Sequence, residues 1–255
     1  MGNFLVFSDY DIIAYLMVGL AMFFILDLVL GSGFLYRHNW NTGSVTGIVL
    51  TAYIAGHLIS TPASWIFENW AVKSCLMYPV VHLVPAKIRS QNPERKTDAS
   101  YLCQVPIRWA ALGDYFAPAP ENVLKRIRAK PLAPDDASLF NEGFNAAKRD
   151  PNTYDRLLIF QRLYLLFRNL GFLTLSAFVA VLIKRGLLQF GWWRPDRHLI
   201  YYGVRPWMIS FWGQLIAFFV LTVALFDRFT VFYRLYSLEV ISAYAYAFTF
   251  VPGGE

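Results

Sequence analysis

The chain has 255 residues, of which 56% are hydrophobic and only 16% are charged. A typical soluble domain is about 25% charged, so this composition excludes an ordinary water-soluble enzyme and favours a membrane protein. Aromatic residues reach 18%, which excludes a disordered chain. The two cysteines, Cys75 and Cys103, are too few for a disulfide scaffold or a cysteine-rich zinc site.

Four apolar segments predict four membrane-spanning helices, because a span needs about 20 mostly apolar residues. We expect these helices at residues 12–30, 44–67, 163–183 and 207–226. The third is the least regular, since it takes in Arg168. The acidic start of the chain lacks the basic leader of a signal peptide. The sequence therefore predicts an all-α integral membrane protein with four transmembrane helices.

The segment between the second and third spans differs in composition from the rest of the chain. From Lys73 to Arg156 there are 13 basic and 9 acidic residues, and prolines recur throughout. We expect a small, loop-rich helical domain with short helices at residues 121–130 and 134–149. The sequence therefore predicts three parts. Residues 1–68 form an N-terminal helical hairpin, residues 69–155 an extramembrane basic domain, and residues 156–255 a C-terminal helical hairpin with amphipathic extensions.

The orientation of these segments follows from the number of spans. An even number places both termini and the central domain on one side of the membrane. Basic residues near the span ends are almost equally divided between the two sides, so the positive-inside rule favours neither. We place the termini and the central domain in the cytoplasm, because basic amphipathic helices adjoin that domain and anionic inner-leaflet lipid suits them. The expected location is a bacterial inner membrane.

A short internal repeat lies where the C-terminal hairpin meets the membrane surface. Residues 155–166 and 227–238 agree at seven of twelve positions. Convergence of two interfacial helices on arginine, leucine and tyrosine is an alternative explanation. In either case, both helices are expected to continue beyond the bilayer. Opposite charges are expected to pair between the two copies, and the residues concerned are Asp155, Arg162, Asp227 and Arg234.

Small residues recur every four positions along the second span, which lets helix backbones approach closely. One row is formed by Ala52, Gly56, Ser60 and Ser64, and the adjacent row by Gly43, Gly47, Thr51 and Ala55. Packing within the chain and packing between protomers both explain such rows. A four-span protein has few helices to cover both, so we predict that one row meets a second protomer.

Polar side chains inside the spans are candidates for function because they are costly in a bilayer. They are Asp27, His57, Arg168 and Asn169. Asp27 and His57 are expected to differ by roughly 15 Å in depth, which makes them poor partners for acid–base chemistry. A lipid-acting enzyme with His57 as base and Ser60 as nucleophile is one alternative. A histidine buried between helices is the simpler interpretation.

Other chemical signatures are missing from the sequence. The four histidines occur singly, and there is no phosphate-binding glycine loop, dinucleotide fingerprint or GxSxG turn. We therefore expect no catalytic residues, no metal and no cofactor. The net charge of +6 favours acidic headgroups or an acidic partner protein, and no direct binding of nucleic acid is expected.

Three stretches of the chain resemble a family of uncharacterised bacterial multispanning membrane proteins. They are residues 53–60 (YIAGHLIS) leading to Glu68, residues 76–79 (LMYP), and residues 139–144 (LFNEGF) through Tyr154 to 167–170 (FRNL). The resemblance covers roughly residues 50 to 175 and implies no activity. In architecture alone, the chain is similar to membrane effectors of bacterial antiviral systems, such as those encoded beside a catalytically inactive prokaryotic Argonaute.

These features together predict a non-enzymatic membrane effector or channel-like subunit. It is expected to form a homo-oligomer and to perturb the lipid bilayer when a cytosolic protein partner signals, in the manner of abortive infection. The alternatives are the lipid-acting enzyme built on His57 and Ser60, and a passive membrane anchor for a soluble complex.

Overall fold

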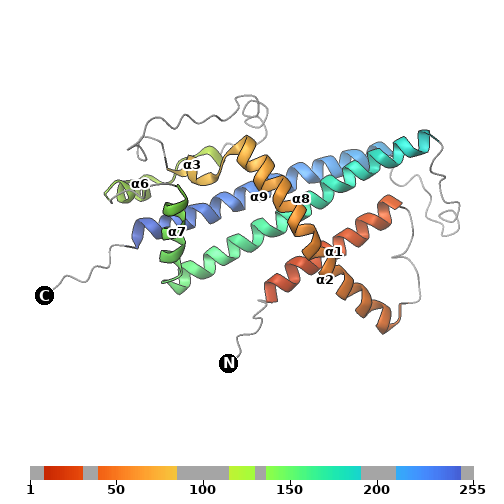
Figure 1. The fold of residues 1–255 in the computed structure, drawn as a ribbon, viewed down its shortest axis with the longest axis horizontal. Helices are drawn as coiled ribbons and strands as arrows, with labels where there is room; N and C mark the ends of the chain where they lie inside the picture. Colours follow the sequence, from red (N-terminus) through yellow and green to blue (C-terminus); the bar gives the residue numbers. More distant parts are fainter. Residues whose placement is uncertain (1–8, 31–39, 85–114, 130–135, 191–210, 248–255) are drawn as a thin grey trace. The chain divides into compact units, whose positions relative to one another are not determined.

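The computed structural model describes residues 9–30, 40–84, 115–129, 136–190 and 211–247 (Figure 1). Every regular element within these ranges is helical, and the ranges contain no strand. The expected all-α class is therefore confirmed for the described part of the chain. The first residues of the expected span 207–226 lie outside the described ranges.

Eight helical segments occur in the described ranges, two of them far longer than the rest (Figure 1). In chain order they are α1 (Asp9–Leu30), α2 (Thr42–Ser64), a π-helical segment (Trp65–Leu76), α3 (Pro79–Leu83), α6 (Glu121–Arg128), α7 (Asp136–Ala147), α8 (Pro151–Gln189) and α9 (Phe211–Tyr246). With 39 and 36 residues, α8 and α9 exceed the length that a bilayer requires. Both helices are therefore long enough for the expected extensions, and their continuation beyond the bilayer stays a prediction.

Three helical stretches are long and apolar enough to cross a membrane, and they are Thr42–Lys73, Pro151–Gln189 and Phe211–Tyr246. They contain the expected spans 44–67 and 163–183 and the described part of 207–226. The expected span 12–30 lies within α1, whose apolar stretch Ala14–Leu30 is shorter. The chain therefore has the helices of a membrane protein, and a fourth span at α1 stays a prediction.

The chain forms two compact units, each assembled from separate stretches of sequence. The first consists of Met1–Phe67 and Leu166–Phe226, and the second of Glu68–Leu165 and Asp227–Glu255. Helices α8 and α9 contribute residues to both units. The predicted segments 1–68, 69–155 and 156–255 describe membrane topology, which these contacts do not measure.

In the first unit, α1 and α2 pack with their backbones in direct contact (Figure 1). A Cβ atom at Gly19 would overlap the carbonyl oxygen of Ala52, and one at Gly56 would overlap that of Tyr15. Only glycine permits so close an approach at these two positions. An apolar cluster elsewhere in the unit joins α1, α8 and α9 through Val29, Ala177, Val181 and Phe218.

The second unit has a core of aliphatic and aromatic side chains. Amphipathic α6 buries Val123, Leu124 and Ile127 and leaves its basic residues exposed. The expected helices 121–130 and 134–149 correspond to α6 and α7, each slightly shorter than predicted. Aromatic rings of α8 and α9 meet in a tilted arrangement, with the ring centroids of Tyr164 and Tyr233 5.2 Å apart.

Candidate functional site

A buried polar cluster in the first unit joins α8 to α2. Arg168 is 4% exposed and Asn169 is 2% exposed. The Nη2 atom of Arg168 donates to the Ser60 Oγ atom at 2.8 Å and lies 3.4 Å from the Ser60 carbonyl oxygen. Its Nε atom donates to Asn169 Oδ1 at 3.1 Å. The structure thus brings together Arg168 and Asn169 with Ser60, a member of the small-residue row.

The local sequence explains how α8 reaches Ser60. Ser60 belongs to the row of small residues on α2, which leaves room for the guanidinium group of Arg168. Gly171, one turn further along α8, lets the ring of Phe67 approach, with a Cβ position 3.3 Å from the ring. An arginine guanidinium keeps its charge in proteins, and a buried charge is tolerated when hydrogen bonds satisfy it. The two oxygens of Ser60 and that of Asn169 provide these acceptors.

Two threonines extend the polar contacts from α8 to α9. Thr222 Oγ1 donates to Thr174 Oγ1 at 2.9 Å and lies 2.7 Å from the carbonyl oxygen of Phe218. Thr174 in turn donates to the carbonyl oxygen of Gly171 at 3.0 Å. The sequence analysis missed this pair, although isolated threonines in an apolar stretch are a signal for hydroxyl contacts between helices.

Asp27 on α1 lies far from the place where α1 contacts His57 of α2. Asp27 is 8% exposed, and near it the Nζ atom of Lys184 donates to the carbonyl oxygen of Val29. His57 instead contacts Tyr15, which precedes Asp27 by twelve residues on α1. At 1.5 Å per residue, about 18 Å of helix separates Asp27 from that contact. The two side chains therefore do not form one acid–base site.

His57 is exposed, so the expectation of a histidine buried between helices is wrong. It makes ring contacts in place of the catalytic hydrogen bond that the enzyme alternative requires. Its imidazole stacks on Tyr15 with ring centroids 3.8 Å apart and meets the edge of Tyr53 at 4.7 Å. Within the described ranges, no hydrogen bond joins His57 to Ser60, whose hydroxyl accepts from Arg168. A nucleophile needs a base within hydrogen-bond reach, so the geometry gives the lipid-acting enzyme no support.

The two rows of small residues on α2 have different surroundings. In the first row, Ala52 and Gly56 are buried against α1, and Ser60 meets Arg168. Ser64 is half-buried. In the second row, Ala55 is buried, whereas Gly43, Gly47 and Thr51 are exposed. A Cβ atom at Gly47 would have no atom within 4 Å, and one at Gly43 would meet only the Asn41 side chain at 3.6 Å.

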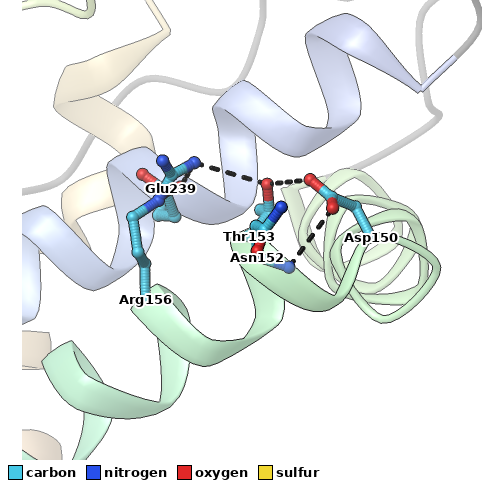
Figure 2. Close-up of polar contacts among 5 residues, drawn as sticks. All are labelled: Asp150, Asn152, Thr153, Arg156 and Glu239. Carbon is cyan, nitrogen blue, oxygen red and sulfur yellow. Dashed lines mark hydrogen bonds and ion pairs between the residues drawn. The ribbon is translucent and has the colours of Figure 1, made fainter.

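An ion pair of the second unit joins α8 to α9 through Arg156 and Glu239, neither of which is among the four residues expected to pair. Arg156 Nη2 lies 2.8 Å from Glu239 Oε1, and Arg156 Nε donates to the same oxygen at 3.0 Å (Figure 2). The sequence analysis missed Glu239 because it follows the repeat by one residue. Of the four residues expected to pair, Asp155 is exposed, Arg162 and Asp227 are half-buried, and Arg234 donates to the Ala117 carbonyl oxygen at 3.2 Å.

Asp150 caps the start of α8 beside this ion pair (Figure 2). Its Oδ2 atom accepts from the Thr153 hydroxyl at 2.6 Å, and its Oδ1 atom accepts from the Asn152 backbone at 3.2 Å. The hydrogen bond from Thr153, together with the weaker backbone bonds and the charge of Arg156, holds the pKa of Asp150 below its ordinary value. This N-terminal cap fixes the first turn of α8, from which Arg156 reaches Glu239.

Comparison with family models, with curated proteins and with solved structures gave no match. Within the described ranges, no group of histidine, cysteine or acidic residues could hold a metal ion. Function is therefore inferred from the chain's own residues, chiefly the polar cluster at Arg168 and the exposed row on α2.

Proposed function

We propose that this chain is a non-catalytic subunit of a bacterial inner membrane that self-associates and perturbs the bilayer when a cytosolic protein partner signals. The observation that carries the proposal is the contrast between the two small-residue rows of α2. The row that contains Ala52, Gly56 and Ser60 packs against α1 and α8. The first three residues of the other row, Gly43, Gly47 and Thr51, are exposed. An exposed row of this kind on an apolar helix supports contact with a second copy.

The exposed start of α2 suits helix–helix packing better than contact with lipid. Gly43, Gly47 and Thr51 lie on successive turns, and Val49 and Leu50 beside them are 41% and 61% exposed. Lipid tails are as apolar as leucine, so association of membrane helices depends on close van der Waals packing. Flat glycine surfaces flanked by aliphatic side chains permit such packing.

The buried polar cluster supports a role in altering the membrane. Arg168, Asn169 and the Thr174–Thr222 pair place charge and hydroxyl groups within helices that are long and apolar enough to span. Such groups are rare inside membranes and commonly mark paths for ions. Assembly of several copies would bring several of these clusters close to one another.

The second unit offers a surface for the proposed signalling partner. Basic residues outnumber acidic ones among its exposed side chains, and the basic ones include Lys125, Arg126, Lys148, Arg149 and Arg228. A surface of one charge steers association with an opposite charge. We propose that the partner is acidic and that the unit faces the cytoplasm, with antiviral defence as the setting.

The test compares the wild-type full chain with two glycine-to-leucine variants. Gly47→Leu places its side chain in open space on α2, so the fold should persist while assembly is lost. Gly186→Leu is the matched control, because a Cβ at Gly186 on α8 also has no atom within 4 Å. Mass measurement in lipid nanodiscs reports assembly, circular dichroism reports folding, and a voltage-sensitive dye reports membrane potential in cells.

We expect the wild type and Gly186→Leu to form oligomers and to depolarise cells, and Gly47→Leu to do neither. A wild type that is monomeric at every concentration and leaves the potential unchanged overturns the proposal. An oligomer that leaves the potential unchanged even with its partner active favours the passive anchor. If His57→Ala keeps assembly and depolarisation, the enzyme alternative is removed.

A further inference from the structure

Arg234 of α9 is a half-buried cation with an unused donor. Its Nη2 atom donates to the carbonyl oxygen of Ala117 at 3.2 Å. Its Nε atom is buried and has no hydrogen-bond partner among the described residues. A buried donor without an acceptor costs free energy, and the cost is larger when the group is charged.

The surroundings of Arg234 are held in place, so the backbone cannot easily move to supply acceptors. The segment that carries Ala117 is fixed at both ends. Ahead of it, the Tyr115 hydroxyl donates to the Met77 carbonyl oxygen at 2.7 Å, and after it the Ala119 backbone donates to the Leu83 carbonyl oxygen at 3.0 Å. Tyr115 is 2% exposed, and burial raises its pKa, so its hydroxyl keeps its proton.

Other arginines of the same unit differ from Arg234. Arg156 pairs with Glu239, and Arg128 pairs with Glu121 at 3.3 Å. Arg126 lies over the ring of Tyr246, 4.1 Å from its centroid. All three are exposed, whereas Arg234 is half-buried and has one acceptor, a neutral one, among the described residues.

We infer that Arg234 binds a phosphate group. A guanidinium presents several N–H donors in one plane, which match the oxygens of an oxyanion. Arg234 is half-buried and its Nε atom is buried, so we infer that an oxyanion is bound through the terminal N–H groups of the guanidinium. It follows the uncharged stretch 207–226 by eight residues, a position suited to a phospholipid headgroup at the membrane surface. A free phosphate ion offers the same chemistry.

The experiment uses the full chain in two arms. In the first, nanodiscs of neutral phosphatidylcholine are titrated with inorganic phosphate by calorimetry. In the second, phosphatidic acid is added to the nanodiscs, and native mass spectrometry counts the molecules retained by each chain. Arg234→Gln removes the charge, and Arg234→Lys keeps the charge but loses the planar donors. Arg228→Gln, an exposed arginine on the same helix, is the matched control.

We expect the wild type and Arg228→Gln to bind one of the two probes equally, with binding at least about tenfold weaker in Arg234→Gln. Arg234→Lys should be intermediate. Binding in the first arm identifies free phosphate, and binding in the second alone identifies a lipid headgroup.

Failure of the wild type to bind either probe overturns the inference, whether or not the variants fold. An equal loss in Arg228→Gln also overturns it, because the effect is then general charge. Asp114 lies three residues before Ala117 in the sequence. If Asp114→Asn binds phosphate or phosphatidic acid and the wild type does not, the Asp114 carboxylate pairs with Arg234 in the wild type. The inference is then wrong.

Discussion

The hydrogen bond between Ser60 and Arg168 allows a quantitative test of the buried cluster. Replacing Ser60 with alanine removes the acceptor at 2.8 Å and leaves the Ser60 carbonyl oxygen at 3.4 Å and Asn169 Oδ1 at 3.1 Å. Hydrogen bonds to charged groups contribute about 1.5–3 kcal/mol in soluble proteins. Interhelical bonds in a membrane average about 0.6 kcal/mol and reach about 1.7.

These two ranges meet at the value we expect for Ser60→Ala. Arg168 is charged and 4% exposed, which places the loss near the upper membrane value. The remaining carbonyl oxygen limits the loss by accepting part of the bond. We therefore predict that unfolding becomes easier by about 1.5 kcal/mol.

The assay is reversible unfolding of the full chain in mixed micelles, followed by circular dichroism. Ser176→Ala is the matched control, because the Ser176 hydroxyl bonds only to the carbonyl oxygen of Phe172 in its own helix, at 2.9 Å. We expect the control to change the free energy of unfolding by less than about 0.5 kcal/mol. Equal effects of the two substitutions would refute the assignment of Ser60 as a partner of buried Arg168.

Three further predictions concern other contacts. Gly56→Leu should prevent folding, at a cost of about 3 kcal/mol or more, because its side chain would overlap the Tyr15 backbone. Ser64→Ala should have almost no effect. Circular dichroism and the mass of the protein in nanodiscs would test both. Glu239→Gln should lower stability by only about 0.5 kcal/mol, since Arg156 is 61% exposed, and 1 M salt should remove the difference from the wild type. The lowered pKa of Asp150 predicts a contribution to stability that is present above the unfolded pKa of about 3.9 and is lost as pH falls through the lower folded value. Acid unfolding of Asp150→Asn should therefore converge with that of the wild type at low pH, and a constant difference at every pH would count against the capping role.

Helix identity was predictable because apolar runs and basic helix ends are local signals. The expected spans 44–67 and 163–183 and the short helices at 121–130 and 134–149 all correspond to helices. The helix that starts at Thr42 changes at Trp65 to a π-helical segment that runs to Leu76. Pro62 lies three residues before this change and lacks the N–H that an α-helix uses, so one backbone hydrogen bond is missing near the change. Composition alone did not predict the continuation.

Partner choice was less predictable because it depends on how helices pack. The repeat indicated paired charges on α8 and α9, but Glu239, which bonds Arg156, lies outside the repeat. Gly19 has no small neighbour four residues away to mark it, yet it lies against Ala52. Similarly, nothing in the sequence distinguishes the hydroxyl of Ser60 from that of Ser64 as the acceptor for Arg168. These choices are fixed by crossing points between helices, and a pattern along one helix does not contain them.

Arg168 and Arg234, one buried and one half-buried, illustrate why hydrogen-bond partners, rather than burial alone, separate a structural role from a binding role. Arg168 has three acceptor oxygens from Ser60 and Asn169, so the chain itself supplies partners for its Nε and Nη2 atoms. Arg234 has one backbone oxygen, and its Nε atom has none among the described residues. A charge with several acceptors stabilises one arrangement of helices, whereas a cation with few acceptors gains free energy when an outside oxyanion bonds its terminal N–H groups. For this reason, we assign packing of α2 against α8 to Arg168 and recognition of phosphate to Arg234.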